Sequence, residues 1–568
     1  MLGLSVPDWI VLFAYFAGTV GLGLWTLRKV KSSGDYFMGG RRFGKLLMVA
    51  QAFGVGTHTD QPVSVSGAAY TNGLAGIWYQ WIYLFATPFF WLVAPIYRRL
   101  RYVTMADFFE FRYGKGIAML YTFVGMLYFA MNMGVMLKGT GVTVEGLTGG
   151  VLREEWVIVI ATVLFVSYGL AGGIIAAVYT DLIQGILILI LSFMLIPFAL
   201  KAGGGLQRMA EGLPDHMFSL VAPSEVTLWF IIAAVVNGLV HVVVLPHHMA
   251  IGGAGKSEIA SRSGWTYGNF LKRFATAGWA FTGVFAAFLI PGLTDADREL
   301  AFGLIARELL PTGFVGLMFA AMIAAVMSTC DAFMVHASAL YTQNFHKRFV
   351  RRELTEEETL KIARMAGFGI VVGGLVFAYG FPTVVDGIKE AWKVTAYMGV
   401  AFWMGILWRR ANHWGAICSA LAMFLAGSVS DYFLGWSFAA QVTLYIPVGF
   451  FVCVLVSLLT RPEEEKKMDE FYLLLDTPVG FEKRLHAKGV RIVLEGHIES
   501  AGSPELEEKA AARRREDGLI LVDALDLLRG RRRFTWQRYK VDLVGFAAAC
   551  GLAAATIGVV WLVAGLVR

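Results

Sequence analysis

A short run of oxygen-bearing side chains lies inside an apolar stretch of the chain. Ser328 and Thr329 are adjacent, and Asp331 follows two residues later within the stretch 311–345. Hydroxyl and carboxylate oxygens are the ligands that small hard cations prefer. Either hydroxyl alone could bond back to the preceding helical turn, but a carboxylate cannot do so and needs a partner. The run is therefore a candidate cation site.

Two other apolar stretches contain residues that interrupt helices. The sequence GVGTHTDQP (54–62) falls within the stretch 43–73, and the stretch 226–250 contains Asn237-Gly238 and then Pro246. Ordinary kinks would explain these residues, but broken backbone at mid-bilayer depth is tolerated where it lines a protein cavity. Two interrupted segments five spans apart, each leading a block of five, predict an inverted-repeat transporter with its sites at the breaks.

The amino-acid composition limits the class of protein to which these segments belong. Of 568 residues, 57% are hydrophobic and only 16% are charged, and the mean hydropathy is +0.61. These values exclude a water-soluble multidomain enzyme and a disordered chain. The four cysteines all lie in apolar runs, which is typical of core residues rather than of disulfides or metal ligands.

Apolar runs long enough to cross a bilayer, about 20 residues each, occur along almost the whole chain. We expect an all-α polytopic membrane protein with about fourteen transmembrane helices. The predicted spans are 7–27, 43–73, 75–97, 116–147, 156–177, 178–200, 226–250, 274–294, 311–345, 362–381, 383–408, 412–433, 437–460 and 541–567.

Basic residues are confined to alternate loops between these spans. The loops 28–45, 98–115, 256–273, 347–364 and 409–410 hold about 23 Lys and Arg, against about five in the other loops. The asymmetry predicts an N-terminus outside the cell and these loops inside, in an inner (cell) membrane. It also accounts for the net charge of +7 without a nucleic-acid partner.

One long polar segment, 461–540, falls on the cytoplasmic side by the same parity. It begins RPEEEKKMDEFY and ends RGRRRFTWQRYK beside the last span. We expect a small helical regulatory or packing segment whose basic end lies against anionic headgroups. It carries no nucleotide loop, metal-ligand cluster or nucleophile motif, so the protein is not expected to be an enzyme.

Three stretches of the chain have motifs of a known family: GGIIAAVYTDLIQ (172–184), AAVMSTCDAFMVHASALYTQNF (324–345) and VGTHTDQPVSVSGAAYTNGL (55–74). They resemble the sodium/solute symporter family, which includes bacterial sodium/galactose and sodium/proline symporters. DEFYLLLDTPVG (469–480) resembles a tail segment of some members. The resemblance implies a leucine-transporter-like core of five plus five helices. The expected parts are an extra N-terminal helix and loop (1–42), the inverted-repeat core (43–410), two peripheral helices (411–460), the cytoplasmic polar segment (461–540) and a C-terminal transmembrane helix (541–568).

The resemblance also implies where sodium ions bind. The main site falls on backbone carbonyls of Gly54, Thr57 and Ala325 and on the hydroxyls of Ser328 and Thr329. In some members a second site uses an acid, which matches Asp181 here, and two hydroxyls of the same helix as Ser328. Those two hydroxyl positions are Asp331 and Ala332 in this chain, a departure from the pattern of a standard second sodium site. Two carboxylates facing one cavity hold a cation or share a proton, so this second site could bind H⁺ instead of Na⁺.

Solute contacts are expected from several core helices. Positions that match the sugar-carrying members are Asp60, Gln61, Gln80, Tyr83, Asn237 and His241. In the tenth core helix Lys389 shares one helical face with Asp386, Glu390 and Lys393, which indicates a self-paired gate or a ligand site. Lys138 needs an anionic partner at membrane depth, which could be Asp60, Asp386 or a carboxylate of the solute.

The function predicted is therefore secondary active transport. We expect sodium-coupled symport of a small polar organic solute, such as a sugar, an amino acid or a carboxylate, into the cell by alternating access. Na⁺ would be the co-transported ion and the lipid bilayer the surrounding partner. Two alternatives stay open at this point: a proton-coupled symporter that uses Asp181 and Asp331, and a transporter-like membrane sensor of the solute.

Overall fold

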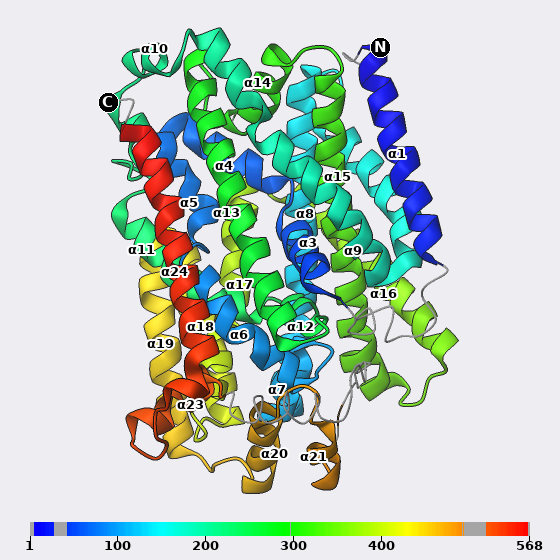
Figure 1. Cartoon of the computed structure of the whole chain (residues 1–568), viewed down its shortest axis with the longest axis vertical. Helices are drawn as coiled ribbons and strands as arrows, with labels where there is room; N and C mark the ends of the chain where they lie inside the picture. Colours follow the sequence, from blue (N-terminus) through cyan, green and yellow to red (C-terminus); the bar gives the residue numbers. More distant parts are fainter. Residues whose placement is uncertain (1–4, 28–42, 296, 491, 493–517, 566–568) are drawn as a thin grey trace.

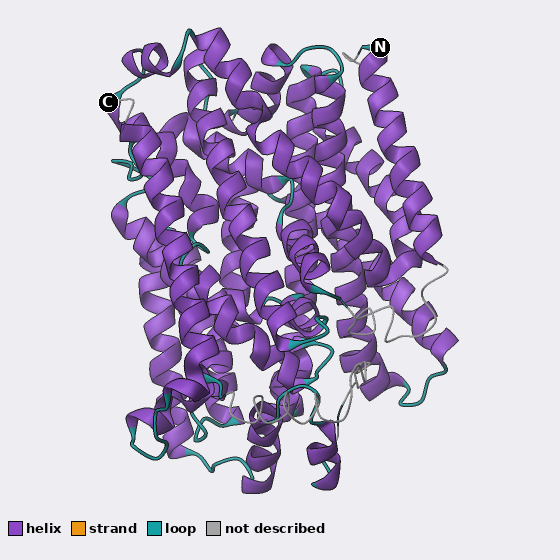
Figure 2. Ribbon diagram, in the orientation of Figure 1, coloured by secondary structure: helices purple, strands orange, loops and turns teal. Residues whose placement is uncertain are grey.

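The computed structural model describes residues 5–27, 43–295, 297–490, 492 and 518–565, and side chains in 19–20, 22–27 and 167–183 are outside this description. Over the described residues the chain is built of helices packed side by side (Figure 1, Figure 2). The one bridge between extended segments there joins Phe43 and Gly255. The expected all-α architecture is confirmed for this part of the chain.

The helices of the first half of the chain include both predicted breaks. They are α1 (Val6–Leu27), α3 (Lys45–Gly56), α4 (Asp60–Asn72), α5 (Trp78–Trp81), α6 (Thr87–Leu100), α7 (Met105–Tyr113), α8 (Lys115–Thr148), α9 (Glu154–Gly203), α10 (Leu206–Glu211), α11 (Leu228–His241), α12 (His248–Gly253) and α13 (Glu258–Leu289). Short 3₁₀ segments join some of them, including η2 (Gly73–Ile77) and η4 (Val242–Val244).

The second half continues the bundle and ends in a helical appendage. Its helices are α14 (Ala301–Leu309), α15 (Phe314–Ala339), α16 (Glu356–Gly380), α17 (Val384–Leu407), α18 (His413–Ser428), α19 (Phe438–Leu459), α20 (Glu465–Asp476), α21 (Glu482–Ala487), α23 (Ile520–Leu528) and α24 (Trp536–Gly565). A π-helical segment, Leu340–Val350, extends α15.

Seven helical segments in the described residues are long and apolar enough by themselves to cross a membrane. They are Lys115–Thr148, Gln184–Gly203, Phe314–Val350, Glu356–Gly380, His413–Phe433, Phe438–Leu459 and Trp536–Gly565. Some other predicted spans are broken or carry charges, and the spans 7–27 and 156–177 include residues whose side chains are not described, so the number of fourteen stays a prediction. The span expected at 75–97, for example, is divided among η2, α5 and α6.

The first predicted break is confirmed between α3 and α4. α3 ends at Gly56, Thr57 is extended (φ −122°, ψ 103°), and α4 begins at Asp60. The second lies further along its segment than Asn237-Gly238, because α11 continues to His241. η4 follows, and Leu245 turns extended at ψ 129° directly before Pro246, as the residue before a proline tends to do.

The eighth predicted span starts too late. Residues 256–273 are expected to form a cytoplasmic loop, but α13 begins at Glu258 and buries Lys272 and Arg273. Hydropathy counts these cations as loop residues, whereas in the fold they lie against other side chains. Arg262, for example, pairs with Asp542 of α24 at 2.6 Å.

The two spans expected at 156–177 and 178–200 belong to one continuous helical stretch, α9, of 50 residues. A straight helix of that length would measure about 75 Å, more than twice the thickness of a bilayer core. Its two halves pack against different neighbours: Glu154 lies against Gly141 of α8, whereas Ser192 lies against Gly278 of α13.

The polar segment 461–540 is helical where it is described, as expected, and it docks on the core. Arg99 at the end of α6 binds Glu258 through two contacts of 3.0 Å and donates to the Leu475 carbonyl. Arg101 pairs with Glu482 at 3.0 Å. Figure 1 shows α20, α21 and α23 at one end of the molecule, and the start of α1 and the end of α24 at the other.

Candidate functional site

The first helix break and α15 bring together backbone and side-chain oxygens. The hydroxyl of Thr329 donates to the Gly54 carbonyl at 3.4 Å. Thr57 and Ala325 line one small cavity next to this contact. Ser328 is fully buried on the same helix as Thr329. All five residues predicted for the main sodium site thus lie on the two elements that meet here.

The chemistry of this set suits a monovalent cation. Its oxygens are neutral carbonyls and hydroxyls, and the Gly54 carbonyl at the end of α3 accepts from the Thr57 amide at 3.2 Å as well as from the Thr329 hydroxyl. The Thr57 hydroxyl is also buried and has no hydrogen-bond partner among the described residues. Neutral oxygens hold Na⁺ without the strong attraction of several carboxylates, which permits release.

Of the two carboxylates predicted for the second site, the structure describes the side chain of Asp331 but not that of Asp181. Asp331 lies on α15, one helical turn after Ser328, and its side chain is buried. Asp181 lies within α9, but its side chain is outside the described residues. The pairing of the two carboxylates therefore stays a prediction.

Polar side chains at the break α3/α4 bind to one another. The carboxylate of Asp60 lies 2.7 Å from Nδ1 of His58. Gln61 donates through Nε2 to the Gly56 carbonyl at 3.0 Å, and its Oε1 is buried without a partner among the described residues. Both residues are almost fully buried, so this break presents hydrogen-bonding groups inside the protein.

Tyr83 contacts the second interrupted segment. Its hydroxyl lies 2.9 Å from Nε2 of His241. His241 in turn contacts the Asn237 carbonyl at 2.9 Å through Nδ1, and Asn237 Oδ1 accepts from the Tyr445 hydroxyl of α19 at 2.7 Å. The predicted residues Tyr83, Asn237 and His241 are therefore joined in one chain of hydrogen bonds.

Two cations of α13 that were predicted in a loop lie beside the same tyrosine. Lys272 Nζ is 5.9 Å and the Arg273 guanidinium 5.1 Å from the centre of the Tyr83 ring. Arg273 donates to the Gln80 carbonyl at 2.8 Å, and the Lys272 side chain also lies against Gly56 at the first break. Gly264 and Gly268, which let α13 approach α3 closely, are the sequence signal that identifies this stretch as a packed helix.

Lys389 lies in a different network, which includes Arg298 directly before α14. Its ammonium is 5.6 Å from the Tyr79 ring centre, and Tyr79 donates to Glu225 at 2.7 Å. Asn72 also donates to Glu225 at 2.8 Å, and Arg298 binds it in bidentate fashion at 2.9 and 3.0 Å. Glu225 has the left-handed φ of 48°, which a non-glycine residue adopts when its contacts hold it there.

These contacts determine the charge of Glu225. Burial alone would raise its pKa, but the hydrogen bonds and charge of Arg298 outweigh burial. With help from Tyr79 and Asn72 they lower the pKa of Glu225 from 4.5 to about 2. The carboxylate is therefore ionised at neutral pH and ties the loop before α11 to Arg298 and the end of α4.

The prediction for the anionic partner of Lys138 is wrong. Lys138 pairs with Glu154 at 2.8 Å, and not with Asp60, Asp386 or a carboxylate of the solute. The reason is local topology: α8 ends at Thr148, Gly149 takes a left-handed turn, and α9 begins with Glu154 back alongside α8. On α17, Lys393 pairs with Glu390 of the same helical face, which agrees with a self-paired face. Lys393 also pairs with Asp431, which follows α18.

The helical bundle with two interrupted segments and inward-facing polar groups defines a secondary transporter. Comparison with known proteins gives the family. The profile of the sodium:solute symporter family matches residues 36–422, and the chain belongs to this family. It is a multi-pass membrane transporter rather than an enzyme, and Na⁺ is its co-transported ion.

Relatives and solved structures agree with this family. The chain is 25% identical to the sodium/glucose cotransporter of Vibrio parahaemolyticus over 74% of this chain and 84% of that protein. It is 25% identical to the high-affinity proline transporter PutP of Bacillus subtilis over 80% of this chain and 99% of that protein. A Na⁺-coupled sialic acid symporter superposes with a TM-score of 0.71 at 18% identity, covering 81% of this chain and 98% of that chain. The nucleobase-cation symporter Mhp1 gives 0.51 at 13% identity, over 78% and 98%. These structures support the leucine-transporter-like fold.

Proposed function

We propose that this protein takes up a small polar organic solute with Na⁺ by alternating access. The ion would bind the carbonyls of Gly54, Thr57 and Ala325 and the hydroxyls of Ser328 and Thr329. The observation that carries this assignment is the contact of the Thr329 hydroxyl with the Gly54 carbonyl, beside a cavity lined by Thr57 and Ala325. The chain would lie in the cell (inner) membrane with its N-terminus outside and 461–540 in the cytoplasm.

Sodium would couple the broken helix to α15. An ion between the two elements holds the end of α3 against α15, so it stabilises the conformation in which they meet. The solute binds next to the same break and favours closure around itself. Coupling then arises because each ligand binds one conformation better than the other, which makes their effects reciprocal.

The solute site would lie around Tyr83. One side of this site would be formed by Gln80, Tyr83 and His241. The other side would be formed by Asp60 and Gln61 at the first break. Lys272 is 6% exposed and has no carboxylate within ion-pair distance among the described residues. A buried ammonium without such a partner needs an acceptor, so the solute is proposed to present an anionic or strongly hydrogen-bond-accepting group to Lys272.

Reconstitution into vesicles tests the proposal. We expect an inward Na⁺ gradient to drive uptake from a panel of sugars, amino acids and carboxylates, and a proton gradient without Na⁺ to drive none. Thr329→Ala should raise the Na⁺ concentration for half-maximal uptake. Ser338→Ala is the matched control, because Ser338 is a buried hydroxyl of the same helix that bonds the Val335 carbonyl. Uptake driven by protons alone and abolished by Asp331→Asn would replace this proposal with proton coupling.

A further inference from the structure

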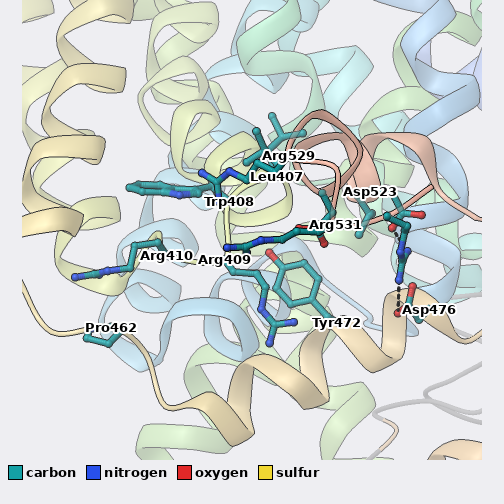
Figure 3. Close-up of a pocket in the computed structure, with 14 residues that line it drawn as sticks. Leu407, Trp408, Arg409, Arg410, Pro462, Tyr472, Asp476, Asp523, Arg529 and Arg531 are labelled. Carbon is teal, nitrogen blue, oxygen red and sulfur yellow. Dashed lines mark hydrogen bonds and ion pairs between the residues drawn. The ribbon is translucent and has the colours of Figure 1, made fainter. Parts of the chain in front are cut away.

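A cavity of about 360 Å³ lies between the transport core and the 461–540 segment. Its walls come from three places: the turn between α17 and α18, the helix α20, and the end of α23. Trp408 and Tyr472 supply aromatic walls, and five arginines and three aspartates line the rest. Figure 3 shows these side chains around the cavity.

Two of the three aspartates are already neutralised. Asp523 is buried and receives hydrogen bonds from Arg532, Arg538 and the Tyr539 hydroxyl. Asp476 lies 3.6 Å from the same Arg532. Asp526 is the one lining carboxylate without an ion pair among the described residues, and its carbonyl accepts from the Arg531 and Arg532 amides.

Three arginines of the lining have no ion pair among the described residues. No described carboxylate lies within ion-pair distance of Arg529 or Arg531, which follow the end of α23. Arg410 donates to the Thr460 carbonyl at 2.7 Å through Nη2, but its Nη1 is buried with no partner among the described residues. The cavity therefore holds three arginines without an ion pair among the described residues, which is more positive charge than the single unpaired carboxylate of Asp526 balances.

The donor set suits a phosphate group. Guanidinium groups bind phosphate oxygens in pairs through a planar fork, which a point charge does not do. The cavity adjoins the basic sequence RGRRR (529–533) that leads into α24, where a cytoplasmic leaflet would place anionic headgroups. Its volume accommodates more than one phosphate group.

We infer that this cavity is a regulatory site for a phosphate-bearing ligand, either the headgroup of an anionic phospholipid or a soluble phosphorylated compound. The ligand binds the guanidinium groups of Arg529 and Arg531. Because the turn after α17 forms the facing wall of the cavity and α23 packs against α17, occupancy fastens the 461–540 segment to the end of a core helix. The site is separate from the sodium and solute sites and does not depend on their assignment.

Thermal unfolding of the full-length purified protein tests this inference. One arm adds sodium pyrophosphate or sodium phosphate in detergent, against NaCl at equal Na⁺ with choline chloride added to equalise the ionic strength. The other compares nanodiscs of phosphatidylcholine with nanodiscs of phosphatidylcholine and phosphatidylglycerol. The variant is Arg529→Gln/Arg531→Gln, whose side chains are exposed and unpaired, so folding should be preserved. The control is Arg484→Gln/Lys488→Gln, which removes the same charge from the same segment outside the cavity.

We expect at least one phosphate probe to raise the melting temperature of the wild type and of the control. In the Arg529→Gln/Arg531→Gln variant the rise should vanish or need about tenfold more probe. A response confined to phosphatidylglycerol identifies a lipid headgroup, and a response to pyrophosphate or phosphate identifies a soluble ligand. No response of the wild type, or equal responses of the variant and the control, would overturn the inference.

Discussion

The network around Glu225 gives a prediction whose size follows from the structure. Glu225→Gln removes the charge that Arg298, Tyr79 and Asn72 contact. Lowering a carboxyl pKa from 4.5 to about 2 corresponds to about 3 kcal/mol of stabilisation of the folded state. The side chain is 29% exposed, and screening by water reduces the expected loss on substitution to about 2 kcal/mol.

The sign of the pH dependence follows from the same shift. Because the pKa of Glu225 is lower in the folded protein, its stabilisation is complete above the unfolded value of 4.5. It is lost as the pH falls from there towards 2. The Glu225→Gln variant should lack this contribution at every pH. The free energy of unfolding of the wild type should therefore fall towards that of the variant as the solution becomes acidic.

A double-mutant cycle at neutral pH measures the pair directly. Unfolding in mixed detergent micelles would compare the wild type, Glu225→Gln, Arg298→Met and the double variant. We expect a coupling free energy of about 2 kcal/mol. The exposed pair Arg153–Glu155, 3.3 Å apart, is the matched control and should give less than about 0.5 kcal/mol. Equal coupling in the two cycles would refute the reasoning.

Three further substitutions separate roles that the sequence left open. Lys138→Met should lower the stability by about 1 kcal/mol through loss of the pair with Glu154 and leave the KM for solute unchanged, and a selective rise in KM would contradict this. Lys272→Met should raise the KM for solute about tenfold while the stabilisation by Na⁺ persists in thermal unfolding, and an unchanged KM would remove Lys272 from the solute site. Asp331→Asn should flatten the pH profile of uptake if the second site binds a proton, and an identical profile would exclude that role.

Residues that are costly in lipid made the central site predictable. Ser328, Thr329 and the run 54–62 stand out because hydroxyls, glycines and a proline have few reasons to occur inside an apolar stretch. The structure places them on α15 and at the break between α3 and α4, and the Thr329 hydroxyl contacts the Gly54 carbonyl. Residue chemistry identified the hydroxyl run and the helix break, whereas the proposed ligand set with Gly54, Thr57 and Ala325 came from the family resemblance.

Pairing between distant elements was not predictable in the same way. Hydropathy treats Lys272 and Arg273 as loop residues, since it adds side chains one by one and does not include the Tyr83 ring that both approach. The partner of Lys138 was missed for a related reason. It depends on how α9 returns along α8 after the turn at Gly149, and no spacing in the sequence specifies that geometry.

Thermal stability in different salts tests the sodium site most directly. The purified protein would be heated in NaCl, KCl and choline chloride at equal ionic strength. A ligand that binds the folded state alone stabilises it by about 2.7 kcal/mol at a hundred times its dissociation constant. We predict a rise specific to NaCl that is lost in Ser328→Ala and Thr329→Ala and retained in Ser338→Ala. Equal melting temperatures in the three salts, or an undiminished rise in both site variants, would contradict the assignment.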